Sequence, residues 1–393
     1  MTELTESEQQ RRQLVAEKHA QAKRLLRESG IDCWLTFQRE GNDNLLPFLI
    51  GGDYLVSQSA LMVFADGPTV AIVADYDGTQ VEGLYDEVHT YALDWREPLL
   101  TTLRERNPAR IGLNYDLHNE GIDGLTHGQY RLLTEAIAPL GLEGRLVSAS
   151  PVTGLVRAVK TATEVERMTR ACEVTQRIFD DLTGMVRPGL TEVDVHEIIG
   201  ERMQTYGVGP SWEASYCPSV TSSKRSAGHT APGTTVIEAG EAFRVDFGVF
   251  YEGYASDMMR TWYLRKPGET VAPPEFQRPF DVVKGAIAAA AEAIRPGVTG
   301  RAVDTAARSL VEAAGYRYTH ATGHQVGKKC HDGGLILGPD NVRYGDRSGG
   351  EIVEGMVFTL EPVFDPIGIE DDVVVTADGC RFLVPTQTEL YLV

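Results

Sequence analysis

The sequence lacks the patterns typical of membrane, secreted and phosphate-binding proteins. No stretch approaches the roughly 18 consecutive apolar residues of a membrane-spanning helix. The N-terminus, MTELTESEQQRRQ, is polar and charged and has no apolar segment of the kind that a signal peptide needs. In the first half of the chain, no GxGxxG or P-loop motif follows a predicted strand. We therefore expect a cytoplasmic protein that does not act at membranes.

Positive charge is scarce. The chain has 37 Lys and Arg residues against 56 Asp and Glu residues, which gives a formal net charge of −19. A nucleic-acid interface needs clustered Lys and Arg to neutralise phosphates, so nucleic acid is excluded as a partner. An acidic excess instead suits divalent cations and cationic small ligands.

Cysteine is also sparse, and its pattern excludes two classes of small stabilised domain. The five cysteines are odd in number and widely scattered, and none forms a CxxC pair, so neither a disulfide framework nor a zinc ribbon is indicated. A reducing cytoplasm fits this pattern. The cysteines are Cys33, Cys172, Cys217, Cys330 and Cys380.

A length of 393 residues predicts two domains. Residues 1–150 alternate between helical and strand periods, as an α/β layer domain does. We place the boundary near Ser150–Pro151, before a long helical pattern, so that residues 151–393 form the second domain. The first domain is expected to contain a helix over 7–29 that ends at Gly30, strands at 31–37 and 110–116, and a hairpin over 60–74.

The second half contains an internal repeat. RPGLTEVDVHEIIGERMQTYG begins at Arg187, and RPGVTGRAVDTAARSLVEAAGY begins 108 residues later at Arg295. In each copy a Thr stands at the expected helix N-cap and a Gly stands near the expected C-terminus. The first copy also has the spacing of a capping box, Thr191-x-x-Asp194. An alternative is that two unrelated loops share the RPGxT pattern.

Each copy is followed by an apolar, strand-like hairpin that carries two acids. The first, FRVDFGVFYEGYASDMMRTW, holds Asp246 and Asp257, and the second, VFTLEPVFDPIGIEDDVVVT, holds Glu361 and Glu370. Both pairs are nearly symmetric about their turns, so the two acids of each hairpin are expected to face each other or nearly so. Directly opposed Cβ atoms lie about 5 Å apart, and like charges placed there are destabilising.

Four carboxylates that converge in an apolar sheet indicate bound cations, because two metal ions about 3.5–4 Å apart can be bridged by such groups. Oxygen-rich ligation favours Mn²⁺, and a nitrogen ligand extends the range to Co²⁺ and Zn²⁺. The segment THATGHQVGKKCHDGG offers His320, His324 and His331, and His229 follows the first repeat copy. Taken singly, each acid is more often a bulge or edge residue and each histidine a surface or core residue. The repeat-related pattern as a whole favours a metal site.

At these residues the chain resembles the pita-bread metallopeptidases, the family of methionine aminopeptidase, aminopeptidase P and prolidase. The first half more weakly resembles the creatinase-type N-terminal domain of aminopeptidase P and prolidase. The resemblance implies a mixed-sheet α/β N-terminal domain and an α+β pita-bread C-terminal domain with a pseudo-two-fold repeat. The matching motifs are VDFG (Asp246), ASDMMRT (Asp257), HATGH (His320, His324), CHDGG (His331), TLEP (Glu361) and IEDDVVVT (Glu370).

The resemblance also implies the roles of these residues in a site with two divalent ions per chain, for which Mn²⁺ is expected. Asp257 and Glu370 would bridge both ions, with Glu361 as ligand and proton carrier. A water activated between the ions would attack the peptide bond. The implied ligands are Asp246, Asp257, His324, Glu361 and Glu370, and His229, His320 and His331 would line the substrate pocket and proton path.

The implied activity is cleavage of the peptide bond before proline. We expect an Xaa-Pro dipeptidase that takes a small peptide with proline after the cleaved bond, and the resemblance implies a homodimer. An aminopeptidase P that acts on longer Xaa-Pro peptides is the main alternative. A metal-free creatinase-like hydrolase and an inactive peptide-binding or scaffolding protein both predict lost ligands, and none is lost here.

Two positions depart from the common pattern of the relatives. Val363 follows Glu361-Pro362 where a Gly is frequent, and Gly368 stands two residues before Glu370 where many relatives have an Arg. The positive charge near Glu370 is therefore expected to come from another residue, such as Arg260 or Arg381.

Overall fold

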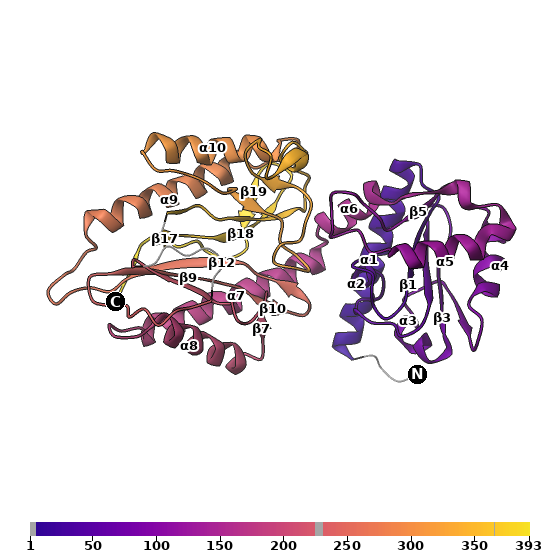
Figure 1. Cartoon of the computed structure of the whole chain (residues 1–393), viewed down its shortest axis with the longest axis horizontal. Helices are drawn as coiled ribbons and strands as arrows, with labels where there is room; N and C mark the ends of the chain where they lie inside the picture. The colour runs from indigo at the N-terminus through magenta and orange to yellow at the C-terminus, as the bar shows by residue number, and fades with distance from the viewer. Residues whose placement is uncertain (1–4, 225–230, 365) are drawn as a thin grey trace. The chain divides into compact units, whose positions relative to one another are not determined.

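The computed structural model describes residues 5–224, 231–364 and 366–393 (Figure 1). The chain divides into two compact units, of which the first ends at Thr163 and the second begins at Glu164. This division lies after α6 (Ser150–Ala158), whereas the sequence placed a boundary before it. The reason is that α6 packs on α1 (Glu6–Ser29), where the buried Lys18 ammonium donates to the Val156 carbonyl at 2.7 Å.

A six-stranded mixed sheet forms the centre of the first unit, in the order β4-β3-β2-β1-β5-β6. Strand β2 runs antiparallel to β1 and β3, whereas β5 runs parallel to β1 and β6. The expected helix over 7–29 is confirmed, and it ends at Gly30 in the left-handed conformation. The strands are β1 (Cys33–Gln38), β2 (Ser59–Phe64), β3 (Thr69–Ala74), β4 (Glu87–Tyr91), β5 (Ile111–Leu113) and β6 (Leu146–Ser148).

Helices cover both faces of this sheet (Figure 1). Successive residues of β1 point to opposite faces, so Trp34 packs in one core and Cys33 and Leu35 pack in the other. The Trp34 core includes side chains of α1, α2 and α6, and the other core includes side chains of α4 and α5. The further helices are α2 (Leu46–Ile50), α3 (Gly78–Val81), α4 (Arg96–Arg106) and α5 (His127–Ile137).

The second unit consists of two helix–helix–hairpin copies, as the sequence repeat predicts. Figure 1 shows its strands lying between α9 and α10 on one side and α7 and α8 on the other. Thr191 and Thr299 are the N-caps of α8 and α10, and Thr191 forms the predicted capping box with Asp194. Gly207 and Gly315 follow the C-caps with positive φ angles of 68° and 86°. The helices are α7 (Ala162–Met185), α8 (Glu192–Thr205), α9 (Pro274–Ala293) and α10 (Gly300–Ala313).

The strands of the second unit form several short sheets, of which the two hairpins are the longest parts. The order is β20-β12-β9-β8 in a four-stranded sheet, with three-stranded sheets β11-β10-β7 and β15-β18-β19 and the pairs β13-β14 and β16-β17. The strands are β7 (Gly209–Pro210), β8 (Ser219–Ser222), β9 (Ala242–Phe247), β10 (Val249–Tyr251), β11 (Tyr254–Ala255), β12 (Met258–Tyr263), β13 (Gly323–His324), β14 (Ile336–Leu337), β15 (Val357–Leu360), β16 (Val363–Phe364), β17 (Ile367–Gly368), β18 (Asp371–Val375), β19 (Cys380–Phe382) and β20 (Tyr391–Leu392).

In the first hairpin the two acids share a face but do not stand directly opposite each other. The residue paired with Asp246 is Met259, so Asp257 lies two positions away, on the diagonal. The turn is at Glu252 and Gly253, as expected, and both have positive φ angles. Diagonal neighbours on one face are about 7–8 Å apart, a distance that long side chains or a shared cation can bridge.

In the second hairpin the predicted opposition is present. The ladders β15/β18 and β16/β17 keep one register, and that register places Glu361 across from Glu370. An isolated antiparallel bridge then joins the hairpins, because Met259 and Glu370 exchange two backbone hydrogen bonds of 3.1 Å each. Opposed positions project to the same face, so the register aligns all four acids on one side of the joined hairpins.

Gly248, which directly follows β9, allows the two strands of the first hairpin to approach closely. A Cβ atom there would lie 1.7 Å from the carbonyl oxygen of Ser256 and 2.5 Å from the hydroxyl of Ser211. A backbone atom cannot move aside as a flexible side chain can. The glycine of the VDFG motif is therefore required by packing between the two acids of this hairpin.

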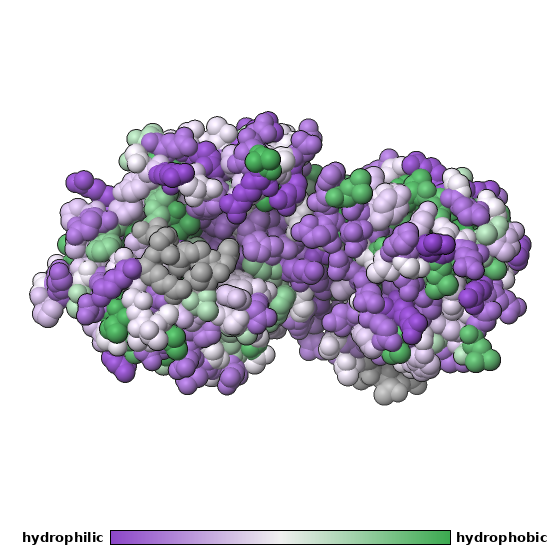
Figure 2. All heavy atoms as spheres, in the orientation of Figure 1, coloured by the Kyte–Doolittle hydropathy of each residue, from purple (hydrophilic) through white to green (hydrophobic). Residues whose placement is uncertain are grey.

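Surface side chains of both units are mostly hydrophilic on the face shown in Figure 2, where hydrophobic residues form scattered spots. Among the described residues, none of the helices combines the length and apolarity that crossing a membrane requires.

We expect Gly248→Ala to lower the free energy of unfolding by at least about 2 kcal/mol, because overpacking against backbone forces the hairpin apart. The matched control is Gly200→Ala in α8, where a Cβ meets nothing within 4 Å. This control should be neutral or stabilising, because alanine is the better helix former. Urea denaturation of both variants measures the difference, and equal stabilities would contradict the packing argument.

Candidate metal centre

All five predicted ligands line one cavity of about 290 Å³ in the second unit. The first hairpin supplies Asp246 at the end of β9 and Asp257 just before β12, and the second supplies Glu361 and Glu370. His324 comes from β13. The complete lining is Trp212, Tyr216, Asp246, Asp257, His324, Cys330, His331, Glu361 and Glu370.

Three of these side chains already lie at ligand spacing. One ligand atom each of Asp257, His324 and Glu370 can be chosen so that all three lie within 4.8 Å of one another. The His324 Nε2 atom is 3.4 Å from Asp257 Oδ2, and its Nδ1 atom is 3.1 Å from the Gln325 carbonyl oxygen. A proton on Nδ1 would satisfy that carbonyl and leave the Nε2 lone pair directed at the carboxylates, as in many metal-bound histidines.

The electrostatics of the cavity are those of crowded acids without a counter-charge. Burial, followed by repulsion from Asp257, raises the pKa of Asp246 well above its usual range, and the same two causes raise that of Glu370. Burial raises the pKa of Glu361 to about 7. Each of these carboxyl groups therefore holds a proton more tightly than in water.

Asp257 and His324 form the exception, because they stabilise each other as an ion pair. Burial opposes the charge of Asp257, but the hydrogen bond and positive charge of His324 lower its pKa below the usual value. Burial likewise opposes the charge of His324, but the Asp257 hydrogen bond and the charge of Glu361 raise its pKa to about 9.

Two buried carboxylate oxygens of the cavity lack partners that bound cations could supply. Among the residues that the structure describes, Asp246 Oδ1 and Glu370 Oε1 have no hydrogen-bond partner. A buried polar atom without a partner costs roughly 1–3 kcal/mol, and more if charged. Divalent cations would complete both oxygens and relieve the repulsion among the acids. The donor set, oxygen-rich with one imidazole nitrogen, fits Mn²⁺, Co²⁺ or Zn²⁺.

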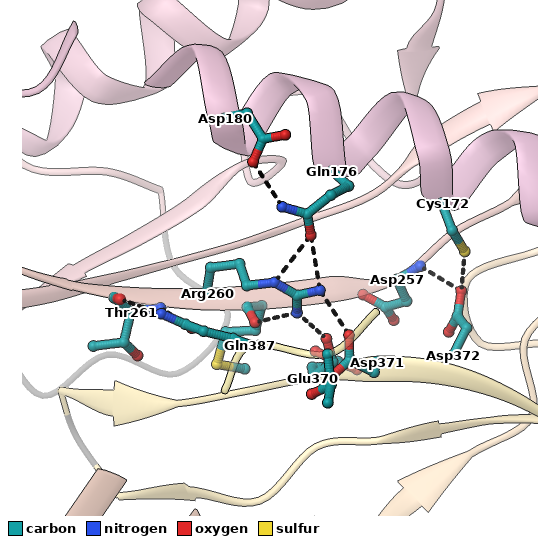
Figure 3. A network of polar contacts seen from close by, with 12 residues as sticks. Cys172, Gln176, Asp180, Asp257, Arg260, Thr261, Glu370, Asp371, Asp372 and Gln387 are labelled. Atoms are coloured by element: carbon teal, nitrogen blue, oxygen red, sulfur yellow. Dashed lines mark hydrogen bonds and ion pairs between the residues drawn. The ribbon is translucent and has the colours of Figure 1, made fainter. Parts of the chain in front are cut away.

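Two further buried acids, Asp371 and Asp372, accept hydrogen bonds from protein groups. The sequence left open that Glu370, Asp371 and Asp372 form a solvated acidic turn, but all three are buried. Asp372 Oδ2 accepts from the Cys172 thiol and from the backbone N–H of Asp257, both at 3.2 Å (Figure 3). Asp372 therefore fixes the backbone that carries Asp257.

Arg260 supplies the positive charge near Glu370, as one of the two residues that the sequence suggested. Its fully buried guanidinium donates to Asp371 Oδ1 at 2.7 Å and to the backbone carbonyl of Glu370 at 2.9 Å. Gln176 of α7 accepts two further hydrogen bonds from it (Figure 3). Arg381, the other suggestion, lies exposed on β19.

The structure describes two of the three histidines expected around the site and places them differently. His331 lines the cavity, with its ring centroid 4.3 Å from that of His324. His320 is not among the lining residues, and its Nε2 atom is 3.2 Å from the backbone carbonyl oxygen of Glu361. Its predicted role in the proton path stays a prediction, and His229 lies outside the described residues.

The sequence reasoning missed three lining residues. Trp212 and Tyr216 belong to the segment SWEASYC, whose aromatic side chains form the apolar part of the cavity wall. Cys330 directly precedes His331, and its thiol donates to Asp257 Oδ2 at 2.8 Å. Cys330 could have been found from the sequence, because it directly precedes His331 and lies between two ligand-bearing segments. Trp212 and Tyr216 could not, because only the fold brings their segment to the acids.

Comparison with known proteins gives one family. The model of metallopeptidase family M24 matches residues 166–377. An uncharacterized peptidase of Bacillus subtilis, YqhT, is 28% identical over 348 residues, which cover 85% of this chain and 90% of the relative. An Xaa-Pro dipeptidase of Pyrococcus furiosus is 29% identical over 243 residues, which cover 60% of this chain and 65% of the relative.

Solved structures show the fold of the whole chain. An Xaa-Pro dipeptidase from Bacillus anthracis superposes with a TM-score of 0.75 at 22% identity, covering 96% of this chain and all of that one. An X-Pro aminopeptidase from Thermotoga maritima superposes with a TM-score of 0.75 at 23% identity, covering 94% of this chain and all of that one. The expected fold, an α/β N-terminal domain followed by a pita-bread domain, is confirmed.

We expect divalent cations to stabilise the protein more as pH rises. The folded-state pKa of Glu361 is about 7, raised from 4.5, so the metal-free folded state binds extra protons between these values. Its stability contribution is therefore present at low pH and is lost as pH rises through 7. Cations bind the deprotonated carboxylates, so loading should restore what is lost.

The measurement is the increase in Tm on adding Mn²⁺. It should be larger at about pH 8 than at about pH 5.5 by at least about 3 °C, the shift that roughly 1 kcal/mol produces. Asp257→Asn, which removes a ligand charge, is the control and should show a smaller increase at both pH values. An increase in wild type that does not depend on pH would contradict the raised carboxyl pKa values.

We expect Arg260→Met to lower the free energy of unfolding by about 3–5 kcal/mol, because it leaves the Asp371 carboxylate buried without its partner. Arg170→Met is the control, because Arg170 pairs with Glu173 on the exposed surface of α7 and its loss should leave stability essentially unchanged. Chemical denaturation of both variants measures the contrast. A small effect of Arg260→Met would show that Asp371 does not depend on this pair.

Proposed function

The chain belongs to metallopeptidase family M24, and we propose that it is a two-metal Xaa-Pro dipeptidase. The observation that carries the proposal is the convergence of Asp246, Asp257, His324, Glu361 and Glu370 on one cavity, with two buried carboxylate oxygens lacking partners among the described residues. Similar proteins include Xaa-Pro dipeptidases and an X-Pro aminopeptidase, which supports cleavage before proline.

The proposed centre holds two divalent ions, with Mn²⁺ as the preferred metal. Asp257 and Glu370 would be shared between the ions, Asp246 would complete one of them, and His324 with Glu361 would complete the other. Bound cations would supply a nucleophile at neutral pH by lowering the pKa of water and would polarise the scissile carbonyl. The orphaned oxygens of Asp246 and Glu370 fit this arrangement.

Protein side chains carry the proton transfers and the positioning. Glu361, which lines the cavity, would accept a proton from the attacking water and pass it to the departing nitrogen. His331 lines the cavity and would donate to the oxygen of the scissile carbonyl. His320 contacts the backbone of Glu361 and would hold that strand in place.

The walls of the cavity suggest how a short peptide is held. Trp212 and Tyr216 offer aromatic surfaces on which a proline ring can pack. The acidic, metal-proximal end suits the free amino group of the substrate. Burial is the main cause of the raised pKa of Glu361 and the lowered pKa of His320, and the nearby charge of Arg343 acts to lower both. Its guanidinium is therefore a candidate partner for a substrate carboxylate.

Three further features belong to this proposal. The protein would act in the cytoplasm on small peptides, without membrane or nucleic-acid partners. It would form a homodimer. The first unit would serve as the creatinase-like N-terminal domain and the second as the catalytic domain. The residues that hydrolyse the peptide bond would all come from the second unit.

We expect the Mn²⁺-loaded protein to hydrolyse an Xaa-Pro dipeptide and to lose this activity on chelation. An Xaa-Pro-Xaa tripeptide should be cleaved at least about tenfold less efficiently in kcat/KM, because a carboxylate-binding pocket closes the site beyond proline. Faster cleavage of the tripeptide would instead identify an aminopeptidase P. An Xaa-Ala dipeptide is the substrate control and should be cleaved poorly.

Asp257→Asn and His324→Ala are the control variants for this experiment. Each removes one ligand, so hydrolysis should be abolished while circular dichroism shows a largely intact fold. Metal analysis should show fewer bound ions per chain. Retained turnover in either variant would contradict the ligand assignment, and a metal-loaded wild type that cleaves neither peptide would favour a binding protein over an enzyme.

A further inference from the structure

A second group of ligand atoms lies at one edge of the same cavity. One ligand atom each of His324, Cys330 and His331 lies within 4.8 Å of the other two. This group, the thiol cluster, shares His324 with the group of Asp257, His324 and Glu370. Its donors are one sulfur and two imidazole nitrogens, in contrast to the oxygen-rich set of the proposed dinuclear centre.

The loop after β13 folds back on itself and so brings the cluster together. The backbone N–H of Asp332 donates to the carbonyl of Gln325 at 2.9 Å, which closes the loop directly after His324. Asp332 Oδ1 also accepts from the backbone N–H of Lys329 at 3.2 Å. Cys330 and His331 therefore return beside His324, and backbone hydrogen bonds hold them there.

The cavity offers a further possible metal ligand beside the cluster, a buried carboxylate oxygen. Glu370 is only 2% exposed and lines the same cavity, and its Oε1 atom has no hydrogen-bond partner among the described residues. The Cys330 thiol itself donates to Asp257 Oδ2 at 2.8 Å. A cation at the cluster would therefore lie beside a buried carboxylate that needs a partner.

We propose that Cys330, His324 and His331 form a thiophilic metal site that captures Zn²⁺ or Cd²⁺ in competition with the dinuclear centre. Thiolate with imidazole is a donor set that selects zinc and other soft or borderline ions, whereas carboxylates suit Mn²⁺. Three protein ligands leave the fourth tetrahedral position open, as is common for zinc. Metal binding releases the thiol proton, which in the metal-free protein forms the hydrogen bond to Asp257.

Competition follows because both groups include His324. Since Nδ1 of His324 lies 3.1 Å from the Gln325 carbonyl oxygen, only Nε2 can face an ion. One nitrogen lone pair binds one ion at a time. An ion held by the thiol cluster therefore removes His324 from the dinuclear centre, so excess Zn²⁺ or Cd²⁺ should inhibit an Mn²⁺-loaded enzyme.

The direct test is the ultraviolet charge-transfer absorption of a Cd²⁺–thiolate bond. Titration of the full-length metal-free protein with Cd²⁺ should produce this band with a stoichiometry of one per chain. Cys330→Ser should abolish the band, because a hydroxyl can still donate to Asp257 but is a hard ligand. Cys217→Ser is the matched control, since the Cys217 thiol contacts the Gly248 carbonyl instead, and it should keep the band.

Cys330→Val covers the case in which serine perturbs the site, and it should also lose the band. Absence of the band in wild type, or its persistence in both Cys330 variants, would overturn the proposal. This readout needs no peptidase activity, so it distinguishes failure of the thiol site from failure of the proposed function.

The competitive effect rests on the proposed peptidase function and has a separate readout. Zn²⁺ added to the Mn²⁺-loaded enzyme should inhibit hydrolysis of an Xaa-Pro dipeptide, and Cys330→Ser should raise the concentration for half-inhibition at least about tenfold, since one of three ligands is lost. Equal Zn²⁺ sensitivity of wild type and Cys330→Ser would overturn the competition. Cys217→Ser should remain as sensitive as wild type.

Discussion

Repulsion among four carboxylates, which the fold holds together away from water, governs both the stability and the metal affinity of the second unit. Burial and mutual repulsion raise the pKa values of Asp246 and Glu370 well above their usual range, and burial raises that of Glu361. Hydrophobic packing cannot remove this cost, because the groups are fixed by strand register. Only protons or cations can relieve it, so the same arrangement that costs stability in the metal-free protein provides metal affinity in the loaded one.

The buried acids of the two hairpins differ in the partners that the protein gives them. Asp371 has a permanent partner in Arg260, and Asp372 accepts from a thiol and a backbone N–H. These contacts are made within the protein and need no ligand. Among the described residues, Asp246 Oδ1 and Glu370 Oε1 have no hydrogen-bond partner, and neither has the second oxygen of Asp372, Oδ1. Asp246 and Glu370 line the cavity and are available to bind cations, whereas Asp371 and Asp372 lie outside its lining and hold neighbouring groups in place.

Much of this arrangement could be predicted from the sequence, because local patterns determine it. The repeat, the caps at Thr191 and Thr299 and the acids in both hairpins depend on short-range chemistry, and the structure places them as expected. The sequence reasoning missed the diagonal placement of Asp257, although the turn at Glu252 and Gly253 determines it, because a hairpin centred between these residues pairs Asp246 with Met259. By contrast, the burial of the Asp371–Arg260 pair arises from packing under α7, which no local pattern reveals.

The thiol cluster shows how a metal site can contain its own competitor. Zn²⁺ binds more tightly than Mn²⁺ to nearly any site of nitrogen, oxygen and sulfur ligands. Selectivity between the two ions must therefore come from geometry, ligand type and metal supply. Carboxylates shift the balance toward manganese, but the single imidazole of His324 and the adjacent Cys330 shift it back. A site with this composition responds to the ratio of the two metals rather than to either one alone. Because both groups share His324, that response is the exchange of the ion that its Nε2 atom binds.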